Sequence, residues 1–159
     1  TLGHRRWLID PWLAHISFGR VDGDKFGTNT TGAAIQVIND AQQDIRSSGI
    51  EFVAYPFEDY PVELYNSDVM MSLTVIGSTS SKWSDANRAD FSKAVITVTG
   101  PGGSLSVNGV RYDTDGYGVP NNLRWYAQGV KAGVAYDVKV SGVKVNGVAR
   151  EYSWWFELD

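Results

Sequence analysis

Short runs of alternating apolar and polar residues occupy most of the chain after Gly49. An alternation with period two places every second side chain on the same face, which predicts a half-buried strand. Turn-forming clusters separate the runs, so the pattern predicts an antiparallel β-sandwich of immunoglobulin-like type over residues 51–159. The alternating runs lie at 71–75, 94–99, 105–110, 123–125, 136–140 and 154–158.

Two local signals refine this prediction. Asn146 and Gly147 form a dipeptide typical of a tight hairpin, so the strands on either side of it are expected to pair. Pro56 and Pro61 flank an aromatic, extended segment. Because proline cannot donate a ladder hydrogen bond, this segment is not expected in the middle of a sheet.

The first fifty residues have a different pattern. A short helix is predicted over 3–9, and Pro11 ends it because a proline disfavours helix at the residue before it. Alternation over 13–20 and a second apolar run over 33–38 predict two strands. The residues between them favour turns, so we expect a hairpin with a long loop.

The segment 39–49 is polar, and a linker or a short helical turn would fit it. One helix and two strands cannot bury enough apolar surface to fold alone. Residues 1–50 therefore either pack on the sandwich or belong to a domain whose other parts lie upstream.

Composition and charge narrow the function classes. The chain is 43% hydrophobic and 20% charged, as in globular domains, and no apolar run is long enough to cross a membrane. Residues 1–50 are neutral, so the net charge of −4 lies in 51–159, and nucleic acid is not an expected partner. The chain has no cysteine, which excludes disulfides, thiolate metal sites and thiol nucleophiles.

The segment "GHRRWLIDPWLAHISFGRV", with the apolar run after it, resembles the C-terminal part of a bacterial CAP domain (the superfamily of cysteine-rich secretory proteins, antigen 5 and pathogenesis-related 1 proteins). Both share a Gly-His-Arg segment, a short helix, a proline-containing turn and a strand, which here ends in "ISFG". The resemblance covers about 40 residues. The rest, with "YPFEDYP" and "YSWWFEL", resembles the β-sandwich that follows the CAP domain in some exported bacterial proteins.

The resemblance implies a fold and a location. Residues 1–50 would be the last strands and short helix of a CAP-type α-β-α sandwich, and 51–159 an immunoglobulin-like sandwich. The remainder of the CAP domain would lie upstream, in the same precursor or in a separate chain. The implied protein is secreted or on the cell surface of a bacterium, and it acts by binding a partner or a ligand such as a small molecule, a lipid or a glycan.

The resemblance also assigns a site residue. His4 matches the second histidine of the CAP cleft, which in the family gathers two histidines and two acidic residues. Some members bind zinc or another divalent metal there, and imidazole suits such a metal. The other cleft residues would come from the upstream part, so no partner of His4 can be named. The alternative is a histidine that hydrogen-bonds near the helix start.

Other residues near His4 are assigned to packing. Trp7 and Leu8 are expected to face the sheet, with one of Arg5 and Arg6 facing solvent. His15 has no acidic residue two positions away, so a catalytic triad carried wholly by this chain is not expected. Two alternatives to a binding protein remain open. One is an exported hydrolase completed by the upstream segment, and the other is a carbohydrate-binding β-sandwich with an aromatic platform.

Overall fold

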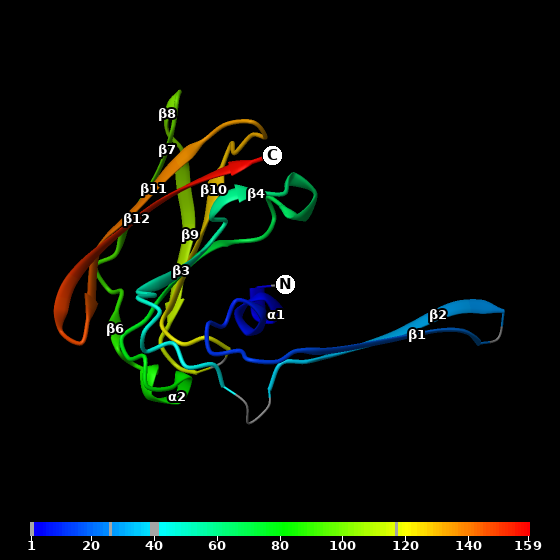
Figure 1. Cartoon of the computed structure of the whole chain (residues 1–159). Coiled ribbons are helices and arrows are strands. Elements are labelled where there is room, and N and C mark those ends of the chain that lie inside the picture. The colour runs from blue at the N-terminus through cyan, green and yellow to red at the C-terminus, as the bar shows by residue number, and fades with distance from the viewer. Residues whose placement is uncertain (1, 26, 39–41, 117) are drawn as a thin grey trace.

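The computed structural model describes residues 2–25, 27–38, 42–116 and 118–159. The chain is mainly β with antiparallel sheets, and its body carries a long two-stranded arm (Figure 1). The elements are α1 Leu2–Leu8, β1 Ser17–Lys25, β2 Thr28–Gln36, β3 Phe52–Tyr55, β4 Glu58–Tyr60, the 3₁₀ turn η1 Val62–Leu64, β5 Met71–Val75, α2 Lys82–Asp85, β6 Ala89–Asp90, β7 Val95–Gly100, β8 Gly103–Ser104, β9 Ser106–Asp113, β10 Asn122–Gln128, β11 Tyr136–Val145 and β12 Val148–Leu158.

Two sheets pack face to face in the body. One has the strand order β3-β5-β10-β9, and the other has the order β4-β12-β11-β7-β8, with β6 paired to β11. The rings of Trp125 on β10 and Trp154 on β12 meet between the sheets, 6.1 Å apart between centroids. Along β11 the side chains of Tyr136, Val138 and Val140 are buried while their neighbours are exposed, as the alternation predicted. The predicted β-sandwich is confirmed at this level.

The local signals in the sequence are also confirmed. β11 and β12 form a hairpin in which Val145 pairs with Val148, and Asn146 and Gly147 have φ angles of 51° and 78°. Positive φ at both central residues is the geometry that Asn-Gly favours. Pro56 and Pro61 flank β4, which is an edge strand of its sheet, so neither proline interrupts a central strand.

The outer face of the β3-β5-β10-β9 sheet is covered as well. Ser72, Thr74 and Asn122 point away from the core between the sheets, yet all three are fully buried. The cover is the N-terminal segment, in which the predicted helix is confirmed as α1. Trp12 and Ile45 from this segment form a second, smaller core with Val119 and the partly buried Ile76. The start of the chain therefore packs on the sandwich as a third layer.

The arm consists of β1 and β2, called the ribbon below. Its strands pair in continuous antiparallel register from Ser17↔Gln36 to Lys25↔Thr28. The predicted hairpin is therefore confirmed. The predicted long loop is wrong, because only two residues separate Lys25, at the end of β1, from Thr28, at the start of β2. The turn-forming residues extend the strands instead, and Thr31 donates a 2.7 Å hydrogen bond across the ribbon to Asp22.

The segment that follows the ribbon is irregular. Residues 39–41 lie outside the described residues. Residues 42–49 contain no helix, so within them the expected helical turn is not formed. Gln42 forms an isolated bridge with Leu13, and Ile45 is buried. This segment therefore acts as a linker that is anchored to the body.

Asp85, at the end of α2, gives the body a pH-dependent stability. Burial raises its pKa to about 6, although the backbone N–H groups of Gly77 and Ser78 donate to its Oδ1 at 2.6 Å. Its buried Oδ2 has no hydrogen-bond partner among the described residues. The folded state therefore binds this proton more tightly than the unfolded state, where the pKa is near 3.8.

We predict that this contribution to stability is fully present below about pH 4 and is lost as the pH rises to about 6. Asp85→Asn should remove that dependence. The measurement is the free energy of unfolding in urea at a series of pH values, taken as the difference between wild type and variant. Subtraction matters because carboxyl groups with lowered pKa, such as Asp113, change stability in the opposite direction. A difference that stays constant from pH 4 to 7 would contradict the assignment.

Candidate binding surface

Arg6 fixes α1 to the sandwich. Its guanidinium makes two 2.7 Å hydrogen bonds to the carboxylate of Asp113, and it also donates to the backbone oxygen of Val119 at 2.7 Å. Arg124 donates to the same carboxylate at 2.8 Å. Burial alone would raise the pKa of Asp113, but the hydrogen bonds from the two arginines outweigh it, so the pKa is lowered.

Close backbone contact accompanies this ion pair. Gly118 has a φ of 82°, and a Cβ atom there would lie 2.8 Å from the Cβ of Arg6. The backbone N–H of Val119 donates to the backbone oxygen of Arg6 at 3.0 Å. The glycine at position 118 thus lets α1 come close enough to the segment before β10 for the backbones of Arg6 and Val119 to form a hydrogen bond.

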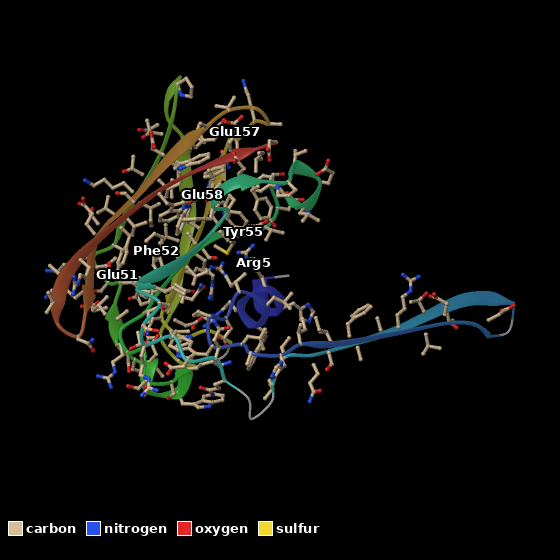
Figure 2. The ribbon with its side chains drawn as sticks, in the orientation of Figure 1. Arg5, Glu51, Phe52, Tyr55, Glu58 and Glu157 are labelled. Atoms are coloured by element: carbon tan, nitrogen blue, oxygen red, sulfur yellow. The ribbon has the colours of Figure 1, made fainter. Side chains whose placement is uncertain are left out.

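Arg5 points from α1 toward β3 (Figure 2). Its guanidinium carbon lies 3.6 Å from the ring centroid of Tyr55. It donates to the backbone oxygen of Met70 and, at 3.3 Å, to the hydroxyl of Ser72. Burial lowers the pKa of Arg5. Both arginines therefore contact the body, and the expectation that one faces solvent is wrong, because the sheet beneath α1 presents polar acceptors instead of an apolar surface.

A second ion pair holds the end of α1. The Nζ of Lys82 lies 2.8 Å from Oδ2 of Asp10, and both side chains are almost fully buried. The backbone N–H of Trp12 donates to Oδ1 of Asp10 at 2.9 Å. Trp7 packs here, with its ring centroid 4.3 Å from the Lys82 Nζ. Trp7 therefore packs on the body as predicted, but through a cation and in a half-buried position.

His4 lies on the exposed side of α1. Leu8, one turn later, is also exposed, which corrects the expectation that it faces the sheet. Arg5 and Arg6 occupy the side that contacts the sandwich, so His4 and Leu8 remain on the other side. The structure thus presents His4 at a surface, and the identity of that surface as a CAP cleft stays a prediction.

The sequence also predicts a divalent metal at His4. Among the described residues, no group of three or more His, Asp or Glu side chains could hold a metal ion. The metal at His4 stays a prediction, and zinc there would need ligands in addition to His4.

The ribbon presents large apolar side chains to solvent. Phe18 and Ile35 are directly paired across the strands, and Ile16, just before β1, is also exposed. Phe18 is 69% exposed and Val21, on the opposite face, is 73% exposed. Beside Val21 that opposite face carries small residues such as Gly19 and Ala34. Exposed apolar clusters of this kind mark interaction surfaces.

Both long edges of the ribbon are also open. β1 and β2 pair only with each other among the described strands, so each has an outer row of backbone N–H and C=O groups. Such edges can add a strand from another segment. Together with His4 and Leu8 on α1, the ribbon forms the candidate binding surface.

Sequence reasoning selected His4 as a candidate but did not identify the residues that fix the position of its helix. The roles of Arg5, Arg6 and Asp10 depend on partners that are distant in the chain. Asp113 lies 107 positions after Arg6, and Lys82 lies 72 positions after Asp10. The available signal was the density of charged and aromatic residues in "HRRWLIDPW", which is unusual for a helix with one solvated side.

Comparison of the chain with models of known families, with curated proteins and with solved structures gives no match. Among the helices of the described residues, none has the length and apolar character needed to cross a membrane.

Proposed function

We propose that this chain is part of a secreted or cell-surface bacterial protein of the CAP superfamily that acts by binding. Residues 1–50 would supply the C-terminal helix and strands of the CAP domain, and residues 51–159 would be its immunoglobulin-like sandwich. One observation carries the proposal: the ribbon stands away from the body with Phe18, Val21 and Ile35 exposed, and no other described strand pairs with either of its edges.

The partner of the ribbon is a CAP-type segment that contributes further strands and helices, from the same precursor or from a separate chain. A two-stranded hairpin is at best marginally stable in water, so a ribbon of two nine-residue strands requires additional packing. At the end of the ribbon nearest the body, Phe18 and Ile35 lie on one face and Gly19 and Ala34 on the other, which suits a sheet covered on both sides there.

His4 would then lie on the wall of the CAP cleft, beside the added strands. A small molecule, a lipid or a glycan would bind there, and a divalent metal would take His4 as one of its ligands. The ion pairs of Arg6 with Asp113 and of Asp10 with Lys82 support this assignment, since they hold α1 in a fixed position on the sandwich.

Hydrogen exchange tests the proposal. In the 159-residue chain studied alone as a monomer, ribbon amides should exchange about 100-fold faster than those of β11 and β12, because only two strands protect them. In the natural protein that also carries a CAP-type segment, the ribbon amides should become protected. Equal protection of the ribbon and β11 in the lone monomer would overturn the proposal.

A double substitution on the ribbon provides the matching mutational prediction. Phe18→Ser with Ile35→Ser should leave the stability of the body within about 0.5 kcal/mol of wild type, because both side chains are exposed. The same change should abolish protection of the ribbon by the CAP-type segment. Urea unfolding and hydrogen exchange measure the two effects, and unchanged protection would count against the ribbon as the contact.

A further inference from the structure

A second surface, separate from the ribbon, lies on the sandwich itself. It is an open groove of about 470 Å³ where the ends of β9 and β10 meet the loop before β5. Its polar and aromatic lining comes from Tyr65, Asp68, Asn108, Tyr126 and Gln128. These residues come from three separate parts of the chain.

The strand geometry explains why these side chains converge. Along β10, Trp125 and Ala127 are buried in the core, so Tyr126 and Gln128 point to the other side of the sheet. Tyr126 pairs directly with Asn108 on β9, next to a register shift. Asn108, Tyr126 and Gln128 are therefore held by paired strands instead of a loop.

Gly109 sets the position of the Tyr126 ring. It has a φ of 62°, and a Cβ atom there would lie 2.9 Å from Cδ2 of Tyr126. The ring rests on the glycine backbone at the irregularity in β9. Tyr126 is half-buried, so part of its side chain stays accessible in the groove.

The charge of the lining decides the ligand class. Among the described residues that line the groove there is no lysine, arginine or histidine, so a phosphate, a sulfate or an acidic sugar would lack a counter-charge. Asp68 supplies the one carboxylate in the part of the lining that the structure describes, so a divalent cation would lack ligands there. The groups present are two side-chain amides, hydroxyls, one carboxylate and two tyrosine rings, which can bond vicinal hydroxyls and stack on an apolar ring face.

We propose that this groove binds a neutral saccharide, with Tyr126 as the stacking residue and Asn108 and Gln128 as the hydrogen-bonding residues. The proposal does not depend on the ribbon, because every lining residue belongs to the sandwich. It gives the protein a glycan contact in addition to the CAP-type partner. An open groove of this volume suits a segment of an oligosaccharide.

Titration of the labelled 159-residue chain with neutral tetrasaccharides, followed by NMR, tests the proposal. The probes are cellotetraose, xylotetraose and the β-1,4-linked tetramer of N-acetylglucosamine. At least one should shift the side-chain amide signals of Asn108 and Gln128, with saturation at or below about 10 mM. No shift of these signals with all three probes would overturn the proposal, as would tighter binding of a sulfated tetrasaccharide at the same signals.

Substitutions locate the binding. Tyr126→Ala should weaken it about tenfold, the loss expected when one stacked ring is removed. Trp155→Ala is the matched control, because Trp155 is an exposed aromatic residue on the other sheet, and binding should be unchanged. Thermal unfolding of both variants checks that they fold. Equal weakening by both substitutions would also overturn the proposal, whereas the hydrogen-exchange result for the ribbon would stand.

Discussion

Arg6→Ala is expected to lower the free energy of unfolding by about 3 kcal/mol. Arg6 is only 5% exposed, and its guanidinium supplies hydrogen bonds to both Asp113 and the backbone oxygen of Val119. Alanine removes all of these donors, so the buried backbone oxygen of Val119 loses the hydrogen bonds from the guanidinium. The loss is not larger because Arg124 continues to pair with Asp113. Urea unfolding at neutral pH measures the effect.

Arg20→Ala provides the matched control. Arg20 also forms an ion pair with an aspartate, at 2.9 Å, but its side chain is 58% exposed and that of Asp22 is 62% exposed. Solvent screens such a pair, so the expected change is within about 0.5 kcal/mol. If the two arginine variants were equally stable, the contacts of Arg6 would not be what holds α1 on the sandwich.

The Arg6 variant also bears on His4. Because the Arg6 side chain joins α1 to Asp113 and Val119, its loss should loosen the helix, which still contacts the sandwich through Arg5, while the two-sheet core remains folded. Amide signals of α1 should then lose protection from exchange before those of β10 and β12. The position of His4 thus depends on the sandwich, which gives that unit a structural role in the proposed binding surface.

The strands of the body could be predicted from the sequence because their pattern is local. Met71, Leu73 and Val75 alternate toward one core, and Asn146-Gly147 fixes the register of its own hairpin. The ribbon shows where this reasoning fails. Asp22 and Gly23 favour turns in isolation, but pairing with Thr31 and Thr30 keeps them in a strand. Cross-strand pairing overrides local preference here.

The sites could be predicted less well because they depend on register and on distant partners. Asn108 meets Tyr126 only through the pairing of β9 with β10 and the irregularity beside Gly109. The burial of Ser72 and Thr74 follows from the third layer above them, which period-two alternation does not reveal. Sequence patterns indicate which residues are apolar, and tertiary contacts decide which polar residues are covered.

Lys82→Met is expected to cost about 3 kcal/mol in the free energy of unfolding. Methionine keeps most of the volume of the lysine stem but removes the ammonium group that lies 2.8 Å from Asp10. The carboxylate of Asp10 would then be buried without its counter-charge, although the N–H of Trp12 would still donate to it. A buried charge without its counter-charge is the expensive case, whereas loss of the pair as a whole is much cheaper.

The double variant separates these two contributions. Lys82→Met combined with Asp10→Asn removes both charges, so it should cost clearly less than the sum of the two single variants. Lys139→Met is the control, since its 2.8 Å pair with Glu151 is more than half exposed on both sides and should contribute within about 0.5 kcal/mol. If the two single variants at Lys82 and Asp10 were additive, or if Lys82→Met were as mild as Lys139→Met, the buried pair would not hold the end of α1. Non-additivity with a mild control would show that the two charges are retained together, because each makes the burial of the other tolerable.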